Sequence, residues 1–397
     1  MPHSASRRAI AFVNVAHLLD HYVLLIFPTA VIVMAHDLGL AYGHLIALST
    51  GAFVAFGLFA LPMGWLAERV GRRNLLAAFF FGCGGALIGL GLSTGSTALA
   101  VWLLILGAFS AIYHPIGASL LVTHATSLGR TLGWNGVFGN VGTAFASGGT
   151  AMAASAFGWR AAFLIPAVVC LTLGAAYLAF APADSAADRR PSVPSSAADF
   201  RLPLPVLLTL FGAALVAGGM TFNITSISLP KAVDERLGFP LPIEAVGWLV
   251  TGVFLFGAMT QLAVGRLVDR FSLPVIFVGL AALQTTGLTL AAAFGGGAML
   301  AGLALAVAGI YGQVVVNDAM VARYTPAHLR TKAYSVRYFL GFTVSGFAAA
   351  LIGVAHGAGG FGLTFGVAAA FAATILCVAL AFRFSLRRPE PADVPTG

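Results

Sequence analysis

Four polar side chains near the N-terminus have the types and spacing of a titratable site. Asn14, His17, Asp20 and His21 are separated by three, three and one residues in an otherwise apolar stretch. At 3.6 residues per turn, all four fall on one face of a helix. Desolvation and a neighbouring imidazolium act on a carboxyl group in opposite directions, so its proton affinity can be tuned toward neutral pH. The pattern therefore predicts a proton-handling carboxyl at Asp20 with His21 as its partner.

A further imidazole, His114, stands directly before Pro115 in another apolar stretch. Imidazole titrates near physiological pH, which makes His114 a second candidate for proton coupling beside Asp20 and His21. The same groups permit a different chemistry, because His17, Asp20, His21 and His114 offer the nitrogen and oxygen ligands that transition metals prefer. A third interpretation makes each histidine a neutral, hydrogen-bonded packing residue. The residue types alone leave these alternatives open.

Polar groups in the second half of the chain indicate where a solute binds. Arg337 and Tyr338 fall about two turns inside an apolar segment, where a guanidinium requires an anion. That anion is either a carboxylate such as Asp318 or an anionic group of the solute. Other polar side chains in apolar segments complete a cavity by hydrogen bonding. The expected solute-binding residues are Asn14, His17, Asn223, Tyr311, Gln313, Asn317, Arg337 and Tyr338.

The elements that position these residues follow from the composition. Of the 397 residues, 59% are hydrophobic and 9% are charged, whereas a soluble domain is about one quarter charged. Apolar runs of roughly 20 residues recur along the chain, which is the length needed to span a bilayer as a helix. We therefore predict an all-α polytopic membrane protein. Its twelve transmembrane helices are expected near 9–35, 43–67, 74–93, 97–123, 130–155, 160–180, 204–229, 243–268, 273–294, 297–322, 331–356 and 361–383.

The distribution of positive charge predicts the orientation of these helices. Lysine and arginine residues in the predicted loops and chain ends number 17 on one side and 3 on the other. Cytoplasmic loops carry the excess of positive charge, so both termini are expected in the cytoplasm and the protein in the inner membrane. The net charge of +8 would favour a nucleic-acid partner in a soluble protein. Here topology accounts for it, and the expected environment is the lipid bilayer, with no nucleic acid.

Two internal matches divide the chain into halves. The segment GWLAERVGRR at 64–73 is followed 201 residues later by GRLVDRFSLP at 265–274. Arg130, Asn135 and Gly139 correspond to Lys332, Arg337 and Gly341 at an offset of 202. The stretch between the halves is rich in Pro, Ser and charge, as flexible linkers are. We predict a six-helix bundle at 1–181, a cytoplasmic linker at 182–203 and a second six-helix bundle at 204–397.

The first loop resembles the signature of the major facilitator superfamily, Gly-x-x-x-Asp-Arg-x-Gly-Arg-Arg. Glu68 replaces the usual Asp, which keeps the charge and adds a methylene. The resemblance implies two six-helix bundles that work by alternating access. It also implies a latch on the cytoplasmic side, which the longer Glu68 side chain is expected to loosen. The latch residues would be Gly64, Glu68, Arg69, Gly71, Arg72, Arg73, Gly265, Asp269 and Arg270.

Within that superfamily, AHLLDHYVLLIFP (16–28) and AIYHPIGASLL (111–121) resemble segments of the fosmidomycin-resistance group of efflux proteins. The resemblance implies export of small polar, phosphonate-type drugs against protons. One feature departs from drug/proton antiporters of the superfamily, which usually carry a Gly-Pro pair before Gly-Gly in the fifth helix. The corresponding stretch GNVGTAFASGGTA (139–151) has the glycine pair without the proline.

Two common enzyme motifs are absent from the sequence. It contains no Gly-x-x-x-x-Gly-Lys-Ser/Thr loop and no His-Glu-x-x-His pair, which argues against ATP hydrolysis and against an intramembrane hydrolase. We predict no enzyme activity and no cofactor. The leading prediction is a monomeric, proton-coupled secondary transporter that moves a small polar or anionic solute outward. The alternatives are a transition-metal or metal-chelate transporter and, in a different class, a membrane sensor or scaffold.

Overall fold

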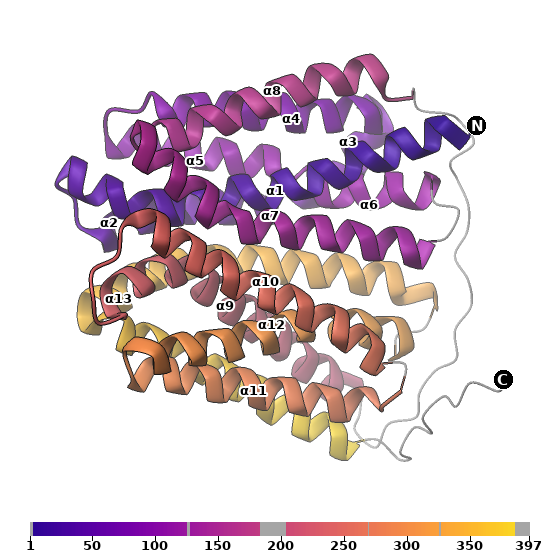
Figure 1. The fold of residues 1–397 in the computed structure, drawn as a ribbon. Helices are drawn as coiled ribbons and strands as arrows, with labels where there is room; N and C mark the ends of the chain where they lie inside the picture. The colour runs from indigo at the N-terminus through magenta and orange to yellow at the C-terminus, as the bar shows by residue number, and fades with distance from the viewer. Residues whose placement is uncertain (1–2, 125–127, 183–203, 269, 325–326, 386–397) are drawn as a thin grey trace. The chain divides into compact units, whose positions relative to one another are not determined.

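The computed structural model describes residues 3–124, 128–182, 204–268, 270–324 and 327–385. These residues form helices and short connections, with no strand among them (Figure 1). The helices are α1 (His3–Leu38), α2 (Tyr42–Leu48), α3 (Thr50–Val70), α4 (Arg72–Gly91), α5 (Ser96–Ser110), α6 (Tyr113–His124), α7 (Leu128–Phe157), α8 (Ala161–Phe180), α9 (Leu204–Arg236), α10 (Ile243–Val268), α11 (Leu273–Ala293), α12 (Gly296–Tyr324) and α13 (Ala327–Ser385).

These helices account for the twelve predicted spans. Ten stretches of the described residues are long and apolar enough to cross a membrane. The last of them, Phe339–Ser385, covers two predicted helices, which meet where Gly359 and Gly360 leave helical geometry. Helix α7 supplies a further element of 30 residues. The predicted all-α membrane fold is confirmed.

The predicted helix at 97–123 is broken in the middle, and its sequence explains why. Helix α5 ends at Ser110 and α6 begins at Tyr113. Pro115 has no backbone N–H to donate to the carbonyl of Ala111, and its ring crowds that carbonyl. Just before this point, the backbone N–H of Ile112 donates to the carbonyl of Phe109, three residues back rather than four, at 3.2 Å. The break places His114 in the first turn of α6.

The chain divides into two compact units. Unit 1 comprises Met1–Arg190, Leu241–Gly252 and Gly346–Gly353, and unit 2 the remainder. The predicted linker falls almost wholly on 183–203, outside the described residues. In unit 1, α1 packs against α7 and α6, while α4 packs against α8 and α5.

The contact between α1 and α7 is a direct approach of two backbones. A Cβ atom at Gly142 would lie 2.1 Å from the carbonyl oxygen of Leu18. Only glycine fits there, as is common where membrane helices pack closely. The two helices lie side by side in Figure 1. This approach brings polar groups of α7 within reach of the titratable face of α1.

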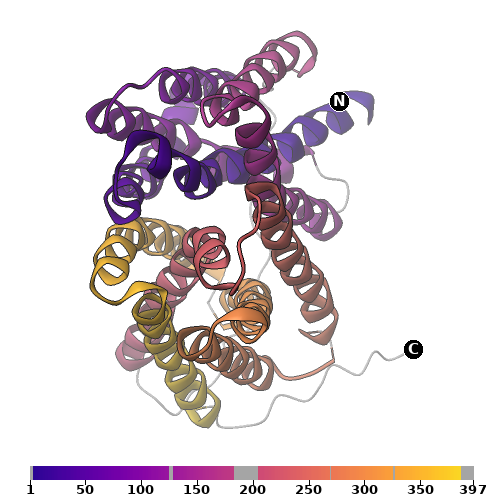
Figure 2. The same ribbon diagram turned by 60° about the vertical axis from the view of Figure 1, so that its left-hand side comes forward.

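Unit 2 is built around α9, α11 and α12. Helices α11 and α12 approach closely, because a Cβ at Gly287 would lie 2.4 Å from the Gly302 carbonyl oxygen. Figure 2 shows the orange and brown ribbons of this pair side by side. Arg236, at the end of α9, donates to the carbonyls of Ala291 at 2.9 Å and Phe294 at 2.8 Å. A positive charge there complements the C-terminus of α11.

Candidate functional site

The core of the site is a buried carboxyl beside an imidazole. The side chain of Asp20 on α1 is 1% exposed, and its Oδ2 lies 3.4 Å from Nε2 of His114 on α6. Both carboxyl oxygens are shielded from solvent. An isolated buried carboxylate is costly. A single proton shared by Asp20 and His114 reduces that cost. It makes either a neutral carboxylic acid beside a neutral imidazole or a carboxylate paired with an imidazolium.

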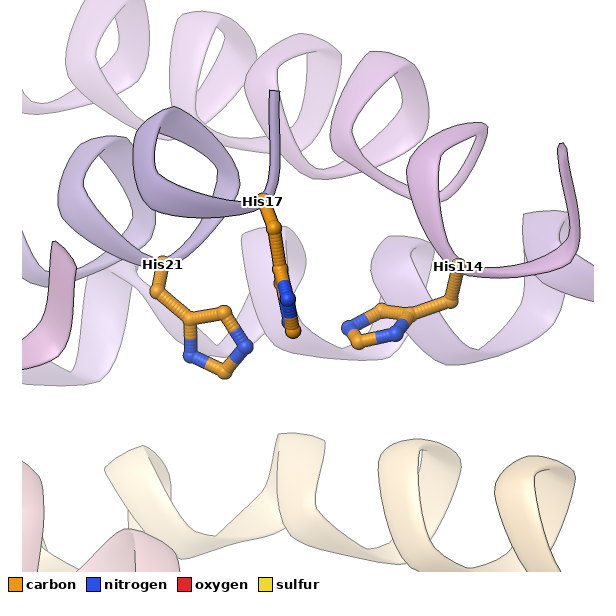
Figure 3. A group of neighbouring side chains, drawn as sticks. All are labelled: His17, His21 and His114. Carbon is orange, nitrogen blue, oxygen red and sulfur yellow. The ribbon is translucent and has the colours of Figure 1, made fainter. Parts of the chain in front are cut away.

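Two further imidazoles complete the cluster. One ring nitrogen from each of His17, His21 and His114 lies within 4.8 Å of the others. Ring centroids are 4.8 Å apart for His17 and His21, and 5.5 Å apart for His17 and His114. Figure 3 shows the three rings turned toward one another from α1 and α6. The structure thus brings His17, His21 and His114 together, with Asp20 beside His114, and this set can pass a proton or supply nitrogen ligands.

Helix α7 supplies partners for His17 that the sequence prediction missed. Nδ1 of His17 lies 2.7 Å from the backbone carbonyl oxygen of Asn135. The side chain of Asn135 donates to Asn14 Oδ1 at 3.0 Å and to the Tyr113 hydroxyl at 2.9 Å. The Tyr113 ring in turn stacks on His17 at 4.8 Å. The predicted solute-binding residue Asn14 therefore belongs to a network that holds His17.

A second residue of α7 holds His21. The Thr143 hydroxyl lies 3.1 Å from Nδ1 of His21 and donates to the carbonyl of Gly139 at 3.3 Å. The sequence analysis assigned no role at the site to Asn135 or Thr143. Residues 135, 139 and 143 are spaced by four, and that spacing places them on one face of a helix. This spacing was the only indication in the sequence that the three residues act together, and it does not show which helix their face contacts.

The solute-binding candidates of unit 2 whose side chains the structure describes lie on α9 and α12. Tyr311 is buried and stacked, with ring centroids 5.9 Å from Phe222 and 6.3 Å from Phe254. Asn223 donates to Gly219 of its own helix at 3.1 Å. Asn317 is partly buried on α12.

Gln313 forms a buried amide pair with Gln284 of α11, a residue that the sequence analysis did not name. Nε2 of Gln284 donates to Oε1 of Gln313. Both side chains are buried. Arg337 and Tyr338 fall within α13, but their side chains lie outside the described part, as does the predicted pairing of Arg337 with Asp318.

The predicted latch residues lie around the connection between α3 and α4. Gly71 has φ of 87° and separates the two helices, a conformation that favours glycine. The guanidinium of Arg69 lies 3.8 Å from the centroid of the Trp65 ring. Arg73 donates to the Leu178 carbonyl near the end of α8. Arg73 therefore ties the start of α4 to α8 within unit 1.

The other latch residues are placed less fully. Arg72 begins α4, Gly265 lies in α10, and Arg270 is exposed after that helix. Gly64 and Glu68 fall in α3 without described side chains, and Asp269 lies outside the described residues. The latch itself stays a prediction.

Comparison with known proteins identifies the family. The profile of the Major Facilitator Superfamily matches residues 10–316 and 210–397. The chain belongs to this superfamily. It is therefore a transporter and not an enzyme. No curated protein sequence matches the chain.

Solved structures share the fold of this major facilitator protein at low sequence identity. A bacterial homolog of the human lysosomal transporter Spinster, inward-facing and unoccupied, is 14% identical with a TM-score of 0.74. The alignment covers 98% of this chain and 100% of the homolog. A variant of the nucleoside transporter NupG is 12% identical with a TM-score of 0.73, over 95% of this chain and 99% of the other. These similarities support the twelve-helix fold.

Proposed function

We propose that the protein is a proton-coupled secondary transporter in which Asp20 carries the coupled proton. The observation that supports this most is the burial of Asp20 beside His114 in the imidazole cluster of unit 1. Asp20 is the one fully buried acidic or basic side chain among the described residues. Such a group inside a membrane protein marks an ion or proton pathway by default.

The chemistry requires one proton to bind and leave in each cycle. In one access state, Asp20 takes a proton that has passed through His114 or His21. In the other state, the proton returns to an imidazole and leaves to the opposite side. Solute and proton bind with different affinities to the two states, so the proton gradient drives the solute. No covalent bond other than those to the proton changes.

The proposed solute is small and polar or anionic. An imidazole cluster attracts anions when protonated, and the amide group of Asn14 in the same unit supplies hydrogen bonds. Resemblance to the fosmidomycin-resistance group supports a phosphonate-type solute and outward transport. The charge bias between the spans supports an inner-membrane protein with cytoplasmic termini. We also propose two six-helix bundles joined at 182–203, a cytoplasmic latch and a monomeric transporter.

The decisive experiment uses the purified protein in vesicles. A thermal-shift screen of phosphonates and carboxylates first selects a solute, since a ligand stabilises the folded protein. In Asp20→Asn, that solute should still exchange across the vesicle membrane, but a pH gradient should no longer drive its accumulation. Asp37→Asn is the matched control, because Asp37 lies on the same helix beside His36 with an exposed side chain. Proton-driven accumulation by Asp20→Asn at the wild-type level would refute the proposal.

Metal binding by the purified protein tests the alternative function, transport of a transition metal. Three imidazole nitrogens within 4.8 Å of one another are a plausible set for a transition metal. Calorimetric titration with zinc would then show tight binding that His17→Ala removes. Tight binding with metal-dependent flux would replace the proton proposal, and absence of binding would retire the alternative.

A further inference from the structure

The face of α7 that contacts α1 supports an inference about how the imidazoles are prepared for proton transfer. We propose that Asn135, Gly139 and Thr143 are positioning residues that hold His17 and His21 with Nδ1 protonated and Nε2 free. The proposal rests on the proton-coupling function above and adds what orients the imidazole rings of His17 and His21.

The partner of His17 fixes its neutral tautomer. A backbone carbonyl can only accept a hydrogen bond, so Nδ1 of His17 carries the hydrogen that points at Asn135. Nε2 then bears the lone pair, and within the described part of the chain it has no hydrogen-bond partner. A buried nitrogen in that state is available to take a proton from a neighbour.

The contact of His21 with Thr143 supports the same tautomer by a different route. The Thr143 hydroxyl has one hydrogen and lies 3.3 Å from the Gly139 carbonyl oxygen and 3.1 Å from Nδ1 of His21. We assign that hydrogen to the carbonyl, which can only accept, so the hydroxyl oxygen accepts from Nδ1–H of His21. Nε2 of His21 is left as the basic nitrogen, in the ring that Figure 3 shows turned toward His17 and His114.

Gly139 makes both contacts possible. A Cβ at this position would lie 2.6 Å from Nε2 and Cε1 of His17, so any side chain would displace the ring. Among the described residues, the titratable groups that face the two rings are His114 and Tyr113 on α6, and Asp20 on α1 contacts His114. Helix α7 contributes hydrogen-bonding groups and no acidic or basic side chain between 131 and 157. Its role is to set tautomers and not to exchange protons itself.

The test of the Thr143 contact is spectroscopic and functional. Nitrogen-15 spectra of histidine-labelled protein distinguish protonation at Nδ1 from protonation at Nε2. In Thr143→Val, the tautomer ratio of His21 should shift by about fivefold, the worth of one net hydrogen bond. The pH profile of proton-driven flux should shift with it, and Thr143→Ser should restore both. Thr172→Val is the control, because Thr172 makes the same bond four residues back, to Val168, without touching a histidine.

The test of the Gly139 contact uses two glycines of one helix. Gly139→Ala should change the nitrogen-15 signature of His17, whereas Gly136→Ala should not, since a Cβ at Gly136 meets nothing within 4 Å. Unchanged histidine spectra in both Thr143→Val and Gly139→Ala, or an unaltered pH profile in both, would overturn the positioning role. Asp20→Asn separately tests the proton function, so failure of one proposal is distinguishable from failure of the other.

Discussion

The two units of the molecule differ in what they bury. Unit 1 buries Asp20 beside His114, one of three clustered imidazoles on α1 and α6. Among the residues of unit 2 that the structure describes, the fully buried polar side chains are hydroxyls and amides, including Thr225, Gln284 and Gln313. Hydroxyl and amide groups bind solutes by hydrogen bonds but do not titrate near neutral pH. Under the proposed function, proton chemistry belongs to the first unit and hydrogen bonding without proton exchange to the second.

A contrast also exists in how each unit is held together. In unit 1, the α1–α7 contact carries site residues, because Asn135 and Thr143 flank the close approach at Gly142. In unit 2, the α11–α12 contact at Gly287 and Gly302 carries no ionisable group. Changes in packing should therefore affect coupling in one unit and stability alone in the other.

The largest expected effect comes from removing the imidazole beside Asp20. His114→Gln should reduce proton-driven accumulation by about 100-fold or more, the usual contribution of a proton-transfer group. The remaining flux should depend less on pH. Gln313→Leu should weaken solute binding while leaving the pH profile as in the wild type. Flux into vesicles measured across a pH series tests both variants. Equal loss of proton coupling in His114→Gln and Gln313→Leu would contradict the proposed difference between the two units.

Glycine substitutions at the two close contacts come next. Gly142→Ala in unit 1 and Gly287→Ala in unit 2 should each destabilise the protein by about 1–3 kcal/mol, because the added carbon meets a backbone oxygen. Only Gly142→Ala should also alter coupling. Thermal unfolding with flux assays checks this, and Gly279→Ala is the control, since no atom lies within 4 Å of its added Cβ. Loss of coupling in Gly287→Ala would contradict the assignment.

The buried amide pair of unit 2 should contribute to stability without contributing to coupling. Gln313→Leu leaves the Nε2 group of Gln284 without its acceptor, which should cost about 1–3 kcal/mol. The double substitution with Gln284→Leu should recover part of that loss, because no buried donor then lacks a partner. Chemical unfolding of the two variants measures the difference. An unchanged midpoint in the single variant would show that the pair is not stabilising.

The smallest expected effects concern two arginines at helix ends. Arg236 of unit 2 makes three bonds to carbonyls at the end of α11, whereas Arg160 of unit 1 makes one, to Ser93 at 3.3 Å. Arg236→Ala should therefore lower stability by about 1–2 kcal/mol, and Arg160→Ala by less. Thermal unfolding of both variants tests the order, which would be wrong if Arg160→Ala proved the more damaging.

Part of the site was predictable because its residues share one helix. His17, Asp20 and His21 lie on one face at any packing geometry, since the helical repeat alone places them there. The addition of His114 required only that the helix containing Pro115 pass nearby. Asn135 and Thr143 were not predicted, because their contacts join residues 118 and 122 positions apart. Helical periodicity shows which residues of a helix share a face, but it does not show which other helix packs against that face.

The sequence by itself determined the membrane environment and the helical class, because these depend on local hydrophobicity. The division into halves at 182–203, inferred from the internal repeat, stays a prediction. The break before His114 follows from Pro115, whose missing N–H is a local property. Only the tertiary structure decided that Asp20 is buried, that its Oδ2 lies 3.4 Å from His114, and that α7 holds the imidazoles. Those facts depend on which helices come into contact. The glycines that permit the contact are spread among 48 in the chain, and packing alone distinguishes them.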